Sequence, residues 1–510
     1  MPGESRTKKA LLNAQVSMFC YFVGLVTTFF TRKIFIDYLG TEFIGLTGTL
    51  QSLLGFLNIA ELGVGVAISY VLYEPLHQNN QDKIKEIIAV LKFLYQIIGA
   101  FILVGGIVLS AFIPMIFKDT GISMGVIYFG FYAFLASSLL GYYVNYNGTL
   151  LCADQKNYIL TGYFQLATSA KAITQMVLAL YITSFYLFLF IELFFAGINS
   201  IIIQWKVNTT YPWLSIKQLK GRLLLRKYTK IKTSIAQLTV HKIAGFVQFQ
   251  IMPFFVYTYV SLPMVTIFTN YSLLAQRVQV FINGISTGLV AGIGDLIAEG
   301  DIKKIKNLYR ELLTSRIIIC GTLSVILLYV ISPLVGVWLG GEFIVNNNLV
   351  YLIVCSTFLT MTRWITDFFI QGYGMFQDIW APFAEAGIYI FLAVILGPIY
   401  GLTGLLLAPV ISTIVIWYIW KPIFLFWKGF KCPITEYITI FFPPFIPVLL
   451  ALFITPWIVS PIISPSEMET SWLWFSLGAF LVTTTVCIIT IGTSFIFFPC
   501  MRHFFKRFMK

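Results

Sequence analysis

The sequence predicts an all-α polytopic membrane protein with about 14 transmembrane helices. Hydrophobic residues make up 58% of its 510 residues and charged residues only 11%, whereas a soluble globular domain carries roughly 25% charged residues. Apolar runs of about 20 residues, the length that crosses a bilayer as an α-helix, follow one another along the chain. This composition excludes a water-soluble enzyme, a secreted disulfide-bonded scaffold and a disordered chain.

Fourteen apolar segments are long enough to cross a membrane. In chain order they are residues 11–31, 45–73, 92–117, 124–150, 158–183, 185–207, 235–262, 265–293, 312–338, 349–372, 380–397, 402–427, 437–459 and 472–499. The first segment follows a basic start, as a signal peptide does. It is too long for one and lacks a small-residue cleavage site, so we expect a retained anchor.

The basic residues predict the orientation of these helices, because Lys and Arg in short loops stay on the cytoplasmic side. With a cytoplasmic N-terminus, most basic residues fall in inside loops, and the outside loops hold few besides Lys118. We therefore predict that both termini lie in the cytoplasm. The net charge of +13 is explained as an orientation signal, so no nucleic-acid partner is predicted.

A short repeat divides the chain into two halves. Asp82 and Asp301 each open a basic loop that leads into a helix, and those helices are expected to end at Pro114 and Pro333, each pair 219 residues apart. Six helices per repeat make the halves parallel, related by a pseudo-two-fold axis along the membrane normal. The predicted domains are an N-lobe (1–208), a basic linker (209–234), a C-lobe (235–430) and a C-terminal segment with two extra helices (431–510).

The linker is basic and amphipathic over residues 215–227. It is expected to lie on the anionic inner leaflet. A tether between the halves is the favoured interpretation, and a partner-binding role is the alternative.

Ionisable side chains inside the predicted spans are the main candidates for function, because each costs at least about 2.5–3.5 kcal/mol at the centre of a bilayer. The candidate cations, expected to bind an anionic substrate, are Arg32, Lys171, Lys242, Arg277 and Arg363. The candidate anions, expected to act in ion coupling or charge pairing, are Glu61, Glu192, Asp367 and Glu385.

Some of these charges have structural explanations. Arg32 and Lys33 can reach the outer surface and pair with Asp37 or Glu42, and Lys242 can reach the inner headgroups. Arg363 and Asp367 are four residues apart and can neutralise each other on one helix. Glu385 lies close enough to the cytoplasmic end to be a surface group.

Lys171, Arg277 and Glu61 are harder to explain in this way. Lys171 shares a helical face with Thr168 and Gln175, while Arg277 has glutamines beside it. Such polar faces suit a water-filled cavity, and a cationic cavity suits phosphate groups. Glu61 is interpreted either as a proton relay or as the partner of a buried cation.

No cofactor, metal site or catalytic motif is predicted. The seven cysteines have no CxxC spacing, the three histidines are far apart, and no Walker motif is present. The chain is therefore predicted not to be an enzyme.

Several stretches of glycine and apolar residues resemble Wzx-type polysaccharide flippases of the multidrug/oligosaccharidyl-lipid/polysaccharide (MOP) exporter superfamily. The resemblance extends over roughly residues 5–430 and is carried by the segments 39–46, 60–65, 73–76, 291–296, 384–386, 397–404, 421–422 and 428–431. It implies the bacterial cytoplasmic membrane as the location, and two six-helix lobes in a V around a central cavity. It also implies alternating access that moves an undecaprenyl-pyrophosphate-linked oligosaccharide, the expected partner besides membrane lipids and other polysaccharide-assembly proteins.

Three alternatives stay open. A lipid II flippase fits the same observations. A cation-coupled multidrug exporter of the same superfamily should have an acidic cavity with few buried basic residues. A membrane glycan polymerase is the least favoured, since the longest outer loop, about 460–471, has no Arg, Lys or His.

Overall fold

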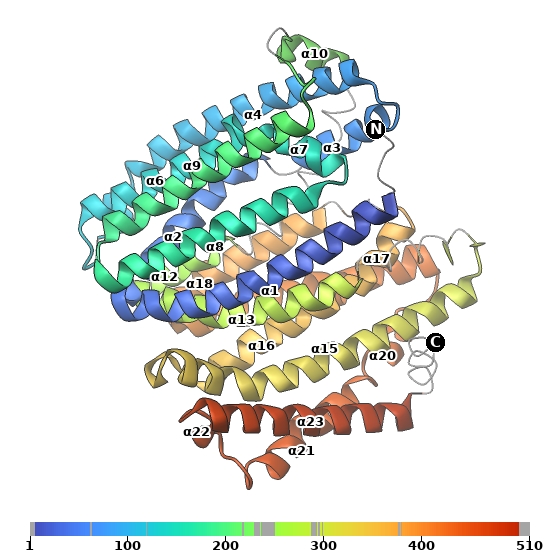
Figure 1. Ribbon diagram of the computed structural model, residues 1–510. Helices are drawn as coiled ribbons and strands as arrows, with labels where there is room; N and C mark the ends of the chain where they lie inside the picture. Colours follow the sequence, from blue (N-terminus) through green and yellow to red (C-terminus); the bar gives the residue numbers. More distant parts are fainter. Residues whose placement is uncertain are drawn as a thin grey trace. The chain divides into compact units, whose positions relative to one another are not determined.

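Every element in the described part of the chain is helical (Figure 1). The computed structural model describes residues 6–498 apart from 62–63, 119, 217–218, 229–234, 236–249, 287–292, 294–295, 298, 376–377 and 379. Within these residues, nine helical stretches are long and apolar enough to cross a membrane. The predicted all-helical, multi-spanning character is thus confirmed, and the count of 14 stays a prediction.

The chain forms two compact units, Met1–Thr266 and Ile267–Lys510. The predicted lobes meet at a linker that ends at residue 234, whereas contacts assign α12 (Met252–Tyr259) to the first unit, where it packs against α2. The lobe boundaries inferred from the repeat stay a prediction.

The first unit contains long helices joined by short turns. In order they are α1 (Arg6–Leu39), α2 (Thr41–Leu57), η1 (Asn58–Glu61), α3 (Val64–His77), α4 (Gln81–Ser110), α5 (Ile113–Ile116), α6 (Met124–Tyr143), η2 (Asn145–Asn147), α7 (Gly148–Ala153), α8 (Asn157–Tyr181), α9 (Phe185–Thr210), α10 (Gly221–Lys227) and α12. Helix α13 (Leu262–Ser286) begins in this unit and continues into the second.

Segments that the charge pattern assigns to one side of the membrane lie together at one end of the first unit. Helices α1 and α8 run side by side (Figure 1), and the Asn13 side chain accepts a hydrogen bond from the Tyr158 amide at 2.6 Å. Lys156 pairs with Asp154 at 2.7 Å, and the Tyr211 hydroxyl donates to the same carboxylate at 2.8 Å. The starts of α1 and α8 and the end of α9 therefore share one end, as the orientation prediction requires.

The second unit continues with equally long helices. In order they are α15 (Ile302–Leu339), η3 (Gly341–Phe343), α16 (Asn347–Thr362), α17 (Trp364–Gly372), α18 (Trp380–Thr413), η4 (Ile414–Trp420), α19 (Lys421–Phe424), η5 (Leu425–Phe430), α20 (Thr435–Phe441), α21 (Phe445–Val459), α22 (Pro465–Met468) and α23 (Trp472–Phe497). Helices α21 and α23 pack against each other and along α15 (Figure 1).

Helix α18 is two antiparallel limbs. Gly401 has φ 56° and ψ −134°, which is not helical. The Trp417 indole donates to Glu385 at 2.8 Å across 32 residues, a separation of about 48 Å in a straight helix. The predicted separate segments 380–397 and 402–427 are therefore confirmed.

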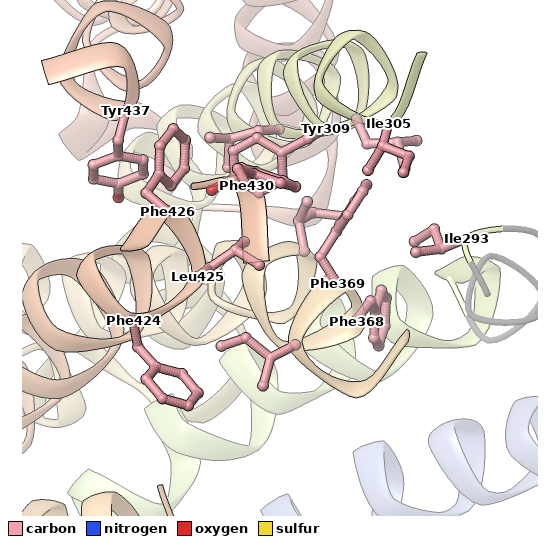
Figure 2. Packing of buried hydrophobic residues seen from close by; sticks show 14 of the residues in the cluster. Ile293, Ile305, Tyr309, Phe368, Phe369, Phe424, Leu425, Phe426, Phe430 and Tyr437 are labelled. Carbon is pink, nitrogen blue, oxygen red and sulfur yellow. The ribbon is translucent and has the colours of Figure 1, made fainter. Parts of the chain in front are cut away.

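Aromatic side chains hold the second unit together where α15 begins. Tyr309 packs edge-to-face on Phe369, Phe426 and Phe430, and Phe426 contacts Tyr437 (Figure 2). These rings come from α15, α17, η5 and α20, so the cluster joins four segments.

The predicted helix end at Pro333 is wrong. Helix α15 continues to Leu339, with Pro333 inside it. Helix α4 does stop before Pro114, at Ser110. The two starts also differ, since Asn80 caps α4 by accepting from the Lys83 amide, whereas Asp301 itself caps α15.

Candidate functional site

A break in the second predicted span places Glu61 inside the first unit. The glycine-rich segment 45–73 forms α2, the short 3-10 helix η1 and then α3, so Asn58 and Glu61 lie at the interruption. Glu61 accepts hydrogen bonds from the hydroxyls of Tyr95 on α4 and Tyr142 on α6, each at 3.0 Å. Asn58 Oδ1 accepts from Ser138 at 3.0 Å. A carboxylate and its neutral donors thus join three helices.

This cluster forms part of a cavity of about 890 Å³ in the first unit. Hydroxyl and amide side chains are common in its wall: Ser69, Tyr73, Tyr95, Ser137, Ser138, Tyr142, Asn145, Thr149 and Thr161. Among the described residues that line it, Glu61 is the only charged one, and no described Lys or Arg forms an ion pair with it. Charge pairing, one of the two interpretations of Glu61, is therefore not seen in the described chain.

Lys171 is paired with Glu192 across helices α8 and α9. The ammonium lies 2.6 Å from the carboxylate, and Gln175, one turn along from Lys171, donates to the Phe188 carbonyl at 3.1 Å. Both charged side chains are about one-fifth exposed. The predicted polar face on this helix exists, but its cation is already neutralised by a predicted anion.

Arg363 and Asp367 do not neutralise each other, so that explanation is wrong. Arg363 lies 3.5 Å from Glu385 on α18, and its guanidinium stacks over Trp417. Asp367 instead lies 3.7 Å from Lys421. Arg363 has helical φ and ψ where α16 meets α17, and tertiary packing brings other partners closer to it than Asp367.

The expected surface location of Glu385 is also wrong. Glu385 is only 4% exposed and Arg363 only 8%, and Glu385 accepts hydrogen bonds from Thr413 on α18 and Trp417 on η4. Lys421, 5% exposed, lies 2.7 Å from Asp378. The second unit therefore holds two ionic groups, Arg363 with Glu385 and Lys421 with Asp378 and the partly buried Asp367.

Arg32 is not among the described residues that line the Glu61 cavity. Arg32 on α1 lies 3.4 Å from the Thr266 carbonyl, and Lys33 forms the expected pair with Asp37 at 3.4 Å. Arg277 is half-buried on α13. Lys242 lies outside the described residues.

Arg316 is a buried cation that the sequence analysis missed. It donates to the Met361 carbonyl at 2.7 Å and to the Ile282 carbonyl at 3.3 Å, joining α15 to α16 and α13. Its position inside the apolar segment 312–338 is the signal that would have found it. Among the described His, Cys, Asp and Glu residues, no group of three or more is arranged to hold a metal ion.

No protein-family model matches the sequence, and no curated protein matches it. Solved structures do match the fold. The lipid II flippase MurJ in an inward closed conformation has a TM-score of 0.63 at 14% identity, covering 95% of this chain and 99% of that one. An inward-facing multidrug resistance MATE family transporter of the MOP superfamily has a TM-score of 0.58 at 15% identity, covering 84% and 99%.

The fold is that of a MOP superfamily transporter. A third match, to a MOP superfamily transporter from Pyrococcus furiosus described as having a binding pocket of reverse polarity, has a TM-score of 0.52 at 16% identity, covering 84% of this chain and 97% of that one. The resemblance to this superfamily is thereby confirmed at the level of the MOP fold.

The solved structures cover different shares of this chain. Ninety-five per cent of 510 residues is about 485, and only 430 residues precede Lys431, so the MurJ match must include about 55 residues or more of the C-terminal segment. The 84% matches correspond to about 428 residues and do not require it. Most of the segment 431–510 therefore lies within the match to the lipid II flippase structure.

Proposed function

We propose that this protein is a transporter that moves a polyprenyl-pyrophosphate-linked oligosaccharide across the bacterial cytoplasmic membrane by alternating access, for cell-surface polysaccharide synthesis. The observation that carries the proposal is the match to the lipid II flippase MurJ, which extends into the C-terminal helices. That likeness supports a lipid-linked cargo. Lipid II itself remains the nearest alternative cargo.

The proposed headgroup ligands are the cations inside the helices. A pyrophosphate needs several donors with positive charge, and arginine supplies both. In the structure Lys171 and Arg363 already have the carboxylates of Glu192 and Glu385 as partners. On binding, a pyrophosphate at these residues would have to compete with those carboxylates, which couples substrate binding to a change of ion pairs.

Arg277→Ala is expected to abolish export of the surface glycan, while Arg277→Lys should retain part of it. Removing one charged phosphate donor typically costs about 1.5–3 kcal/mol, or roughly 10- to 150-fold in affinity. The measurement is flipping of a fluorescent polyprenyl-pyrophosphate glycan in proteoliposomes, normalised to folded protein. Wild-type flipping by Arg277→Ala would remove Arg277 from the proposed site.

A multidrug exporter is the second candidate, and the Glu61 cavity favours it. The cavity has one carboxylate, no described basic residue in its wall, and the aromatic rings of Tyr73, Tyr95, Tyr142 and Phe164. An acidic, aromatic wall is suited to an organic cation, through charge and cation–π contacts. The same carboxylate is suited to carry a proton during transport of another cargo.

Glu61→Gln separates the two candidates, because it removes the charge and keeps the shape. If the cargo is a lipid-linked glycan, binding of the pyrophosphate compound should change by less than about twofold while proton-driven flipping falls. If the cargo is an organic cation, ethidium binding should be lost. Binding of each compound is measured on the purified protein. Proton-driven flipping is measured in proteoliposomes with and without an imposed proton gradient.

A further inference from the structure

A second cavity, of about 600 Å³, lies between the start of α4 and the linker that carries α10. Its described wall contains four basic residues and no acidic one: Lys92, Lys220, Arg222 and Arg226. Lys92 comes from α4 and the other three from the linker. None of the four forms an ion pair with a carboxylate in the described chain. The cavity is therefore positively charged.

The linker is held on α4 by contacts outside this wall. Lys227 pairs with Glu86 at 2.7 Å, and the Tyr228 hydroxyl donates to the same carboxylate at 2.6 Å. Burial and the hydrogen bond to Glu86 raise the pKa of Tyr228, so it stays a neutral donor. Glu86 is thus occupied in holding the linker, and the four cations of the wall have no carboxylate partner among the described residues, although Lys92 also lies 5.9 Å from the centre of the Tyr146 ring.

Gly221 allows the close approach of the two segments. A Cβ at this position would overlap the Ala89 carbonyl oxygen and the Phe93 side chain. The tight contact is incompatible with a linker that lies loosely on the membrane. It fixes the basic residues of the linker opposite Lys92.

Most of the other wall residues are apolar, and Gln96 is the one other polar side chain among those described. Phe93, Ile216, Leu219 and Leu223 line the cavity beside the cations, and Leu223 is largely exposed. A phospholipid suits both kinds of residue in this wall. Its phosphate group can contact the cations, and its acyl chain can contact the apolar side chains. A free phosphate would leave the apolar part of the wall unmatched.

We propose that the cavity between α4 and α10 binds the headgroup of one anionic phospholipid from the leaflet at this end of the protein. The bound lipid bridges Lys92 on α4 with Lys220, Arg222 and Arg226 on the linker. It therefore strengthens the attachment of the linker to the first unit. The proposal is independent of the transported cargo.

The test uses the full-length protein in detergent, titrated with phosphatidylglycerol, phosphatidylcholine or inorganic phosphate and followed by native mass spectrometry. A polybasic site gains roughly fivefold in affinity per basic residue. Arg222→Gln/Arg226→Gln is thus expected to weaken phosphatidylglycerol binding about 25-fold. The matched control Lys303→Gln/Arg310→Gln removes the same charge from exposed positions on α15 and should leave binding unchanged.

Three outcomes would overturn the proposal. They are equal weakening by both double variants, equal binding of phosphatidylcholine, and inorganic phosphate that displaces the lipid at similar concentration. Lys92→Gln, which leaves the linker sequence intact, should weaken phosphatidylglycerol binding about fivefold. Limited proteolysis of the linker should show protection by phosphatidylglycerol in the wild type, and unchanged cleavage would also count against the site.

Discussion

The ion pair between Lys171 and Glu192 shows how a charge is kept inside a membrane helix. A single lysine or glutamate at mid-depth costs several kcal/mol, and a partner 2.6 Å away offsets much of that cost. The sequence identifies both residues as unusual. It does not pair them, because they are 21 positions apart on different helices.

Glu192→Gln is expected to lower the stability of the protein, since it leaves the Lys171 ammonium without its carboxylate. Breaking a buried pair costs about 3–5 kcal/mol, and partial exposure of these side chains reduces our expectation to about 1–3 kcal/mol. Thermal unfolding in detergent should show a lower Tm. The double variant Lys171→Met/Glu192→Leu should recover most of the loss, and a Tm as low as that of the single variant would contradict this account.

The predicted pairing of Arg363 with Asp367 fails for a physical reason. Side chains four apart on a helix meet only if no better partner is closer, and the fold-back of the chain at Gly401 places both Glu385 on α18 and Trp417 on η4 against Arg363. Sequence spacing therefore identified the charged groups but assigned the wrong partner. The same limitation applies to Tyr95 and Tyr142, whose bonds to Glu61 have no local sequence signal.

At the scale of elements, an interruption between two helices places Glu61. Glu61 ends the 3-10 helix η1 that follows α2. The apolar segment 45–73 predicts one continuous helix there. The hydrogen bonds from Tyr95 and Tyr142 that hold Glu61 come from other helices, so the spacing of apolar residues does not encode them.

Close packing between α2 and the start of α13 depends on one glycine. A Cβ on Gly45 would overlap the Leu262 carbonyl oxygen, whereas a Cβ on Gly48, one turn away, would lie 3.7 Å from Val265 Cγ1, an ordinary contact. Gly45→Ala is expected to destabilise the protein by about 1–3 kcal/mol, the usual cost of overpacking. Gly48→Ala should be nearly neutral.

The measurement for this pair is thermal unfolding of the two purified variants side by side. Equal Tm values for Gly45→Ala and Gly48→Ala would contradict the close approach of α2 to Leu262. Alanine is the better helix former, so a drop for both would mean that an added methyl group destabilises α2 at either position, and it would also contradict a specific contact with Leu262.

For the whole molecule, the positive-inside pattern is the strongest prediction. Several of the basic segments assigned to the cytoplasm lie together at one end of the first unit, through contacts such as Asn13 with Tyr158 and Lys227 with Glu86. That gathering is observed within the unit. The side of the membrane that this end faces stays a prediction.

Reporter fusions test the orientation directly. A reporter fused after Tyr228 should report a cytoplasmic location, and one fused after Ser464, between α21 and α23, should report the opposite side. The assay compares a reporter active only outside the membrane with one fluorescent only in the cytoplasm. The reverse result at both positions would invert the topology, and the same side at both would contradict the helix count between them.

By itself, the sequence determined that the chain is a membrane-spanning helical protein, which residues are charged inside it, and that it resembles MOP transporters. These properties follow from composition, the lengths of apolar runs and local motifs, all of which involve residues close together in sequence. Only the tertiary structure decided which charges meet, that Glu61 lies in a cavity without a described cation, and that the basic linker is docked on α4. Those outcomes depend on residues far apart in sequence that packing brings within hydrogen-bond distance, so no local pattern specifies them.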